Sequence, residues 1–268
     1  MTGLLGTPLF AAGEAATTFL ISDLHVPAGG GQVVANLGGV LRAAEAAAAR
    51  VFVLGDLFDS YVARAQVRTG IWRDVAARFA AATAAGTEVV LLHGNRDFLL
   101  GPEFAAASGV RIVAGGLRGQ LAGADTVLVH GDELCQNDLP YQRAKRWLRH
   151  PWTRGLARHL PLRAALAVAA RARAKSRRVV STGDQRRFLP TAAAVEAAFA
   201  TGARRLVFGH IHRFAHGQRE GGEYWVLPAF DEASIGLVTR GDSLVPVRFD
   251  AAGLGADVPL PGPCPLAS

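Results

Sequence analysis

Residues 17–25 read TTFLISDLH, a short and nearly all apolar run that ends in Asp23 and His25. Such a run is typical of a strand buried on both faces of a sheet. Polar side chains that directly follow a buried strand lie at its carboxyl end, where open α/β sheets bind their ligands. The stretch therefore predicts an α/β fold with a functional site at the ends of its strands.

The same arrangement recurs four times further along the chain. A short apolar run precedes each recurrence, and the helix-length stretches 33–50, 69–85 and 191–201 make strand and helix alternate. The side chains that these runs place at strand ends are Asp56, Asn95, Arg96, Asp97, His130, His210 and His212.

Asp, Asn and His are the side chains that a pair of divalent metal ions requires. One carboxylate has to bridge the two ions, and a mixed shell of carboxylate, amide and imidazole has to surround them. Taken singly, Asp56 or Asp97 could instead cap a helix or a turn, and His25 or His130 would more often be a hydrogen-bonded core histidine. Because all five segments occur together, a two-metal hydrolase is the first interpretation.

The regular spacing is interrupted between His130 and His210. From Arg143 to Arg187 the chain has fourteen Lys or Arg against the single acid Asp184, interleaved with Trp and Leu. This pattern predicts a helical lid with a basic amphipathic surface.

The C-terminal runs 223–227, 234–238 and 244–248 predict antiparallel strands joined by Gly-rich turns. A Pro-rich tail follows them and is expected to be poorly ordered. The predicted organisation is a core formed by residues 18–136 and 188–250, a lid at 137–187 and a tail at 251–268.

The amino-acid composition restricts the cellular compartment and the class of protein that we expect. The chain has 268 residues, half of them apolar, which is enough for a full core and excludes a disordered protein. Its net charge of +7 comes almost wholly from arginine. Cys135 and Cys264 form no disulfide framework, which favours a reducing, cytoplasmic compartment. Neither a charged signal-peptide start nor an apolar run of about 18 residues is present, so we expect no membrane span.

The order ISDLH, LGDLFD, HGNRDF, HGDE and GHIHR resembles the calcineurin-like metallophosphoesterase superfamily over residues 19–213. This resemblance implies a four-layer α/β/β/α sandwich with an inserted helical lid and two divalent metal ions. The ions would acidify the attacking water and bind phosphoryl oxygens, with no enzyme nucleophile. The implied ligands are Asp23, His25, Asp56 and His212 for one ion and Asp56, Asn95, His130 and His210 for the other. The resemblance also implies that Asn95, His130 and Asp97 act in catalysis, Asp97 by orienting a histidine or water.

Within the superfamily, LLHGNRDFLLG, HGDELC and a basic insert with RAxxKS resemble the UDP-2,3-diacylglucosamine pyrophosphatases of lipid A synthesis. That family cleaves a nucleotide-activated, twice-acylated sugar, usually with Mn²⁺, to UMP and lipid X. The resemblance implies that the lid contacts the anionic inner leaflet and that the protein is cytoplasmic and peripheral on the inner membrane. The implied substrate-binding residues are Asn95, Arg96, Asp138, Tyr141, Ser176 and His210.

The chain departs from this family in the lid. Val180 and Gly183 stand where an Asn and a Lys commonly reach the head group. Candidates for the missing cation are Arg177, Arg178, Arg186 and Arg187.

Three alternatives stay open at this point. The lid's Trp and Leu side chains could be ordinary packing beneath a solvated basic face. The enzyme could act on soluble nucleotides or other phosphoesters, or the fold could be a non-catalytic scaffold, although the complete ligand set speaks against a scaffold. No nucleic-acid motif accompanies the basic lid, so we expect no nucleic-acid partner. The sequence does not indicate the oligomeric state.

Overall fold

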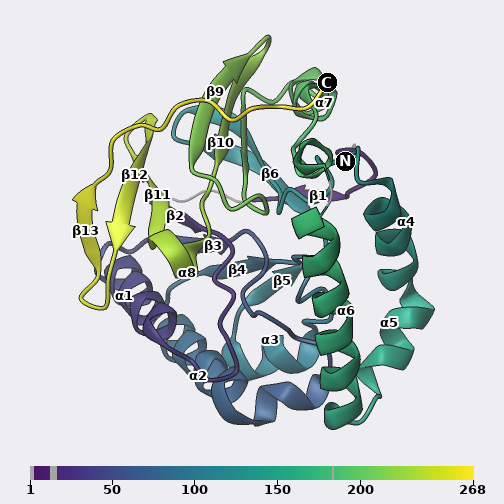
Figure 1. The fold of residues 1–268 in the computed structure, drawn as a ribbon. Helices are drawn as coiled ribbons and strands as arrows, with labels where there is room; N and C mark the ends of the chain where they lie inside the picture. Colours follow the sequence, from purple (N-terminus) through teal and green to yellow (C-terminus); the bar gives the residue numbers. More distant parts are fainter. Residues whose placement is uncertain (1–2, 13–16, 183) are drawn as a thin grey trace.

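The structure, a computed structural model, describes residues 3–12, 17–182 and 184–268. Two β-sheets face each other, and helices cover the outer face of each (Figure 1). This arrangement confirms the predicted α/β/β/α sandwich.

The first sheet has seven strands in the order β13-β12-β11-β2-β3-β4-β5. Its strands β2, β3, β4 and β5 are parallel, as expected for runs separated by helices. The helices α1 (Gln32–Ala46), α2 (Gly70–Ala84) and α3 (Pro102–Ser108) pack on its outer face. The strands are β2 (Thr18–Ile21), β3 (Arg50–Val53), β4 (Val89–Leu92), β5 (Arg111–Val113), β11 (Ile235–Arg240), β12 (Ser243–Phe249) and β13 (Leu254–Asp257).

The second sheet has six strands in the order β1-β6-β7-β8-β10-β9. The helix α7 (Ala192–Ala200) packs on its outer face. Its strands are β1 (Leu9–Ala11), β6 (Gly116–Leu121), β7 (Ala124–Leu128), β8 (Arg205–Phe208), β9 (Ala215–Arg219) and β10 (Gly222–Val226).

Alternation along the buried strands explains the layers. In β3, Val51 and Val53 pack among the helices, whereas Phe52 points into the core between the sheets. Successive side chains of a strand point to opposite faces, so an all-apolar strand fills two cores at once. The apolar runs of the sequence are therefore strands covered on both sides, as predicted.

Two helices are followed by a glycine with a left-handed backbone. Gly86 follows α2 with φ 97°, and Gly202 follows α7 with φ 93°. A residue in this left-handed region ends a helix, and glycine adopts the region without steric cost.

Two details of the predicted organisation differ in the structure. The segment before residue 18 contributes β1, which pairs with β6 in the second sheet. Strand β10 runs parallel to β8 and lies in a different sheet from β11 and β12, so the C-terminal strands are not one antiparallel unit. Pairing partners are set by the packing of distant segments, which local patterns do not encode.

The tail also differs from the expectation of poor order. Residues 254–257 form β13 beside β12. Cys264 is buried, and its carbonyl accepts a hydrogen bond from the Tyr224 hydroxyl at 3.2 Å. Ala267 bridges to Thr191 beside α7. A Pro-rich segment is extended, and here it lies along the second sheet with its backbone groups partly paired.

The segment between β7 and β8 carries the lid, which is helical as the sequence predicts. Its helices α4, α5 and α6 stand side by side at one edge of the sandwich (Figure 1). Within the described residues, no helix combines the length and apolar composition needed to cross a bilayer. The lid elements are α4 (Leu139–Leu148), α5 (Pro151–Arg158), α6 (Leu162–Thr182) and the 3-10 helix η2 (Gln185–Phe188).

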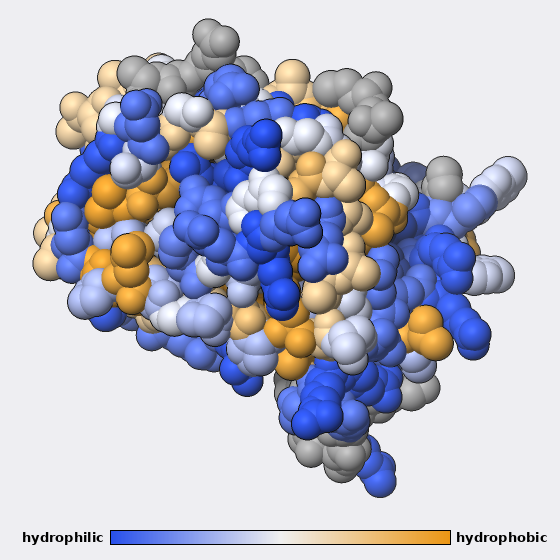
Figure 2. All heavy atoms as spheres, turned by 90° about the horizontal axis from the view of Figure 1, so that it is seen from above, coloured by the Kyte–Doolittle hydropathy of each residue, from blue (hydrophilic) through white to orange (hydrophobic). Residues whose placement is uncertain are grey.

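The lid carries the most exposed large apolar side chains described. Trp147 is 79% exposed, Trp152 84% and Leu156 72%. Figure 2 shows mostly hydrophilic atoms on the side of the molecule where α4 and α5 lie, with isolated hydrophobic groups between them. Trp147 and Trp152 are therefore not packed into the core, so ordinary core packing does not explain these two side chains.

Candidate metal centre

The candidate ligands come from both sheets. In each sheet the strands that precede them are parallel neighbours, so their carboxyl ends meet at the same edge. The facing sheets bring these two edges together. The ligands follow β2 (Asp23, His25), β3 (Asp56), β4 (Asn95), β7 (His130) and β8 (His210, His212).

The backbone is strained at this site. Among the described residues, nine that are not glycine have positive φ, and five of these are predicted ligands. Such a conformation costs about 1–3 kcal/mol per residue and persists only where the surrounding fold enforces it. Strain of this kind concentrates at functional sites. The five φ values are 55° for Asp23, 43° for His25, 51° for Asp56, 69° for His210 and 52° for His212.

Two glycines in the motifs allow the loops to meet. A side chain at Gly94 would collide with the carboxylate of Asp56, and one at Gly209 would collide with that of Asp23. The glycine before Asn95 and the glycine before His210 are therefore required by the close approach of separate strand ends.

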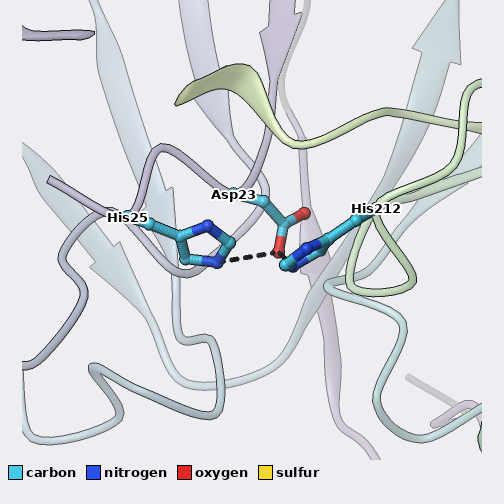
Figure 3. Close-up of side chains that lie close together, drawn as sticks. All are labelled: Asp23, His25 and His212. Carbon is cyan, nitrogen blue, oxygen red and sulfur yellow. Dashed lines mark ion pairs between the residues drawn. The ribbon is translucent and has the colours of Figure 1, made fainter. Parts of the chain in front are cut away.

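The first group of ligands centres on Asp23. Its Oδ1 lies 3.6 Å from His25 Nε2 and 3.6 Å from His212 Nε2. Figure 3 shows the carboxylate between the two imidazole rings. Among the described residues, Asp23 Oδ1 and His25 Nε2 are buried without a hydrogen-bond partner. An ion with ligand bonds of about 2.1 Å would satisfy both atoms, so these residues fit a metal.

The charges of this group favour a bound cation. Burial by itself would raise the pKa of Asp23, but the neighbouring histidines, His212 foremost, hold that pKa well below its usual value. Burial lowers the pKa of His25, yet the nearby carboxylates of Asp231 and Asp56 outweigh it and raise the pKa to about 9. The carboxylates thus attract positive charge to the position between them and His25.

The second group centres on His130. Its Nδ1 lies 2.8 Å from the Leu54 carbonyl, which can only accept, so Nδ1 carries the hydrogen of the neutral ring. Nε2 then directs a lone pair at Asn95 Oδ1, 3.0 Å away. A cation bound by both atoms would relieve the contact between these two acceptors. The His210 ring lies beside that of His130, with 5.0 Å between ring centroids.

Asp56 stands between the two groups. Its Oδ2 lies 3.4 Å from His25 Nε2, and its Oδ1 lies 3.8 Å from His130 Nε2. The Arg96 backbone N–H donates to Oδ1 at 2.8 Å and fixes the carboxylate. One oxygen faces each group, which is the arrangement that a bridging ligand needs. The structure thus brings all seven predicted ligands into one cleft.

Asp97 bonds to the backbone of two ligand loops. Its Oδ2 accepts the N–H of Leu57 at 2.7 Å, and its Oδ1 accepts the N–H of Gly94 at 2.9 Å. It therefore holds together the two loops that carry Asp56 and Asn95, and its predicted role in orienting a histidine or water stays a prediction. Burial, and then the charge of Asp56, raise the pKa of Asp97 to about 7.

Sequence reasoning missed Asp231. This residue lies in the short helix α8 (Phe230–Ala233), and its Oδ1 is 3.4 Å from His25 Nδ1. A carboxylate behind a metal-ligating histidine fixes the ring and its tautomer. Asp231 also lines the cleft of about 460 Å³ that His25, His212 and Arg96 border. No motif surrounds it, so only its position in space identifies it.

Arg96 lies where a substrate phosphate could reach it. Its side chain is 31% exposed and borders the cleft. Its Nη1 donates to Asp59 at 3.0 Å, and its Nε lies 3.3 Å from Asp56 Oδ2. The guanidinium therefore extends from the metal ligands to the rim.

The other predicted substrate residues lie at the base of the lid. Asp138 caps α4 and accepts a hydrogen bond from Arg187 at 2.8 Å. Tyr141 donates its hydroxyl to Asp132, and its ring lies 6.4 Å from the His210 ring, centroid to centroid. The side chain of Ser176 and residue Gly183 lie outside the described residues.

Buried carboxylates and imidazoles at the ends of parallel strands define a metal-dependent hydrolase. A model of the calcineurin-like phosphoesterase family matches residues 16–214, which include all seven candidate ligands. The chain therefore belongs to the calcineurin-like phosphoesterase family.

Within this family the chain is similar to proteins named UDP-2,3-diacylglucosamine hydrolase. The one from Ralstonia nicotianae is 36% identical over 237 residues, 85% of this chain and 87% of that protein. The one from Azotobacter vinelandii is 35% identical over 198 residues, 74% of this chain and 82% of that protein. Among solved structures, an archaeal phosphodiesterase aligns with a TM-score of 0.45 and 10% identity, over 86% of this chain and 98% of that chain.

Proposed function

We propose that this protein hydrolyses the pyrophosphate of UDP-2,3-diacylglucosamine to UMP and 2,3-diacylglucosamine 1-phosphate. The similarity to the Ralstonia nicotianae hydrolase carries this proposal, because it covers 85% of the chain. A match of that extent is not confined to the metal motifs that all members of a phosphoesterase family would have.

We propose two divalent ions, Mn²⁺ in the first instance, as cofactors. Asp23, His25 and His212 would hold one ion, Asn95, His130 and His210 the other, and Asp56 both. When bound, the ions would supply positive charge to the phosphoryl oxygens and acidify the attacking water. Asp97 keeps the loops of Asp56 and Asn95 in place through backbone hydrogen bonds. Asp231 orients His25 so that its Nε2 faces the carboxylates.

Arginine would bind the remaining phosphate charge. Arg96 has a planar fork suited to a phosphate and already borders the cleft. At the base of the lid, Arg187 pairs with Asp138, and its Nε is buried without a partner among the described residues. We propose Arg187 as the cation that substitutes for the lysine that related enzymes carry at the position of Gly183.

The lid would contact the cytoplasmic face of the inner membrane. Trp147 and Trp152 are exposed on a lid that is rich in arginine. Tryptophan side chains partition into the lipid interface, and arginines near an anionic surface contribute about 1 kcal/mol each. We expect the pair Trp147→Ser and Trp152→Ser to weaken binding to vesicles containing anionic lipid by roughly tenfold. The change Trp72→Phe, at a partly buried tryptophan outside the lid, is the control and should bind like the wild type.

The function is tested by incubating the purified protein with Mn²⁺ and UDP-2,3-diacylglucosamine. Equal release of UMP and acylated sugar phosphate is expected. A metal-loaded protein that hydrolyses a soluble phosphodiester but not this substrate would contradict the substrate assignment. Under that outcome, an enzyme for soluble phosphoesters would be the better description.

A further inference from the structure

Asp132 is a buried carboxylate that the metal centre does not use. It lies two residues after His130, and its side chain is almost fully buried. Its Oδ2 is 2.9 Å from Lys145 Nζ and 3.1 Å from Arg149 Nη2, and it also accepts the hydroxyl of Tyr141. Three donors from the lid therefore converge on one carboxylate oxygen of the core.

The three donors occupy one face of a helix. Tyr141, Lys145 and Arg149 follow one another at intervals of four residues along α4 and its C-terminal cap. Residues at this spacing lie above one another on a helix. Gln142 adds two hydrogen bonds from its side chain, to the carbonyls of Asp132 at 2.7 Å and Cys135 at 3.2 Å. One face of α4 thus contacts the loop that follows β7.

Apolar burial contributes little to the attachment of α4. Of its described residues none is fully buried, and Leu139, Trp147 and Leu148 are exposed. Helices in proteins usually owe their stability to a packed apolar face, which α4 lacks. Removing the partners of a buried charge is strongly unfavourable, so the contacts of Asp132 are the main force that keeps α4 in place.

The same contacts reach the metal centre. Arg149 Nη2 also donates to the Gly94 carbonyl at 3.2 Å, directly before Asn95. Tyr141 lies beside His210. The helix is therefore joined to the loops that carry Asn95 and His130 and stands next to a third ligand of the same ion.

We propose that Asp132 is a positioning residue that latches the lid onto the metal cleft through Tyr141, Lys145 and Arg149. The latch sets where the lid stands when the acylated sugar enters, and its loss lets α4 move away from the cleft. The effect on acylated substrate rests on the proposed function, whereas the docking of α4 does not.

The docking is tested by hydrogen–deuterium exchange of the full-length protein. The double variant Lys145→Met and Arg149→Met should increase amide exchange in peptides from α4 and α5 by about tenfold, while β2 and β3 exchange as in the wild type. Asp132→Asn should act in the same direction. The lid-side variant keeps the test valid if a change at Asp132 prevents folding.

The matched control is Arg143→Met with Arg146→Met. Both residues are exposed on the same helix, and the change in charge is identical. This control should exchange like the wild type. Equal exchange in the latch variant and the wild type, or equal increases in latch variant and control, would overturn the proposal.

Kinetics separate positioning from a general structural effect. In neutral detergent micelles, the latch variant should lose about tenfold in kcat/KM for UDP-2,3-diacylglucosamine, mostly through KM. Metal content and hydrolysis of bis(p-nitrophenyl) phosphate should not change, and Lys145→Arg should behave like the wild type. Equal losses on both substrates would contradict a lid-positioning role. If even the wild type does not cleave the acylated substrate, the proposed function fails, and the exchange experiment still decides the latch.

Discussion

The metal cleft and the lid are attached to the fold in opposite ways. Ligands such as Asp23 and Asp56 are fully buried and stand on strand ends that two packed sheets hold rigidly. The lid helix α4 buries none of its described residues fully and is joined to the core through polar contacts at Asp132. We therefore expect the chemistry to reside in a part of the molecule that tolerates little movement, and substrate selection to depend on a part that a few contacts position. We also expect that mutations can impair the metal cleft and the lid independently.

The largest effect is expected in the cleft. Asp56→Ala removes the carboxylate that faces both ligand groups, so both ions should bind more weakly and turnover of every substrate should fall by roughly a thousandfold or more. Elemental analysis and activity on acylated and soluble substrates measure this. Asp59→Ala, at the rim beside Arg96, is the control and should retain both ions. Full metal content in Asp56→Ala would disprove the bridging role.

Removal of the lid should affect only one kind of substrate. The two ends of the insertion are close, since the Thr191 N–H donates to the Leu134 carbonyl at 3.0 Å, so a short Gly-Ser linker can replace residues 137–187. Turnover of acylated substrate should fall by about a hundredfold, while hydrolysis of a small soluble diester stays within about threefold. Thermal unfolding checks that the core is intact. Unchanged turnover of acylated substrate would remove the distinction between the two regions.

Asp231→Ala should weaken the first ion without emptying the second. The carboxylate lies 3.4 Å from His25 Nδ1, and loss of such a partner typically costs ten- to a hundredfold in metal affinity, so about tenfold is expected here. Titration of metal-free protein with Mn²⁺ measures the two binding steps. The neighbouring change Glu232→Ala is the control, because among the described residues Asp231, and not Glu232, forms the ion pair with His25 Nδ1. An equal loss at both steps would show that Asp231 acts on the whole cleft.

Arg96→Ala should give the smallest change and leave the metal ions in place. The backbone N–H that holds Asp56 is retained, so metal content should stay at the wild-type level. Loss of the guanidinium should raise KM for the pyrophosphate substrate by about tenfold. Arg96→Lys keeps the charge without the planar fork, so its KM should lie between those of the wild type and Arg96→Ala. If Arg96→Ala emptied the site, the guanidinium would belong to the metal centre and not to substrate binding.

The candidate ligands of the cleft are easier to predict from the sequence than the residues around them, for a physical reason. Each candidate ligand comes shortly after an apolar strand, so its place at a strand end is a local property that the sequence pattern carries. Asp231 and Asp132 lack such a signal, because their roles depend on which distant side chains arrive beside them. The strand β1 and the ordered tail were missed for the same reason, since both pair with segments far away in the chain.

The resemblance of the motifs to a known superfamily supplied the metal assignment, and the structure adds the contacts of single residues. Asp97 accepts the backbone N–H groups of Leu57 and Gly94. A buried carboxylate takes the donors that face it, and loop geometry decides which those are. Tyr141 likewise donates its hydroxyl to Asp132.

The sequence by itself determined the α/β class, the order of the seven candidate ligands along the chain, and the presence of a basic insertion, because buried strands, residue types and charge runs are local features. Only the tertiary structure decided that two sheets share the ligands, that Asp231 stands behind His25 across 206 residues, and that Asp132 receives one face of α4. These are contacts between distant segments, and the packing of the two sheets is what brings their partners together.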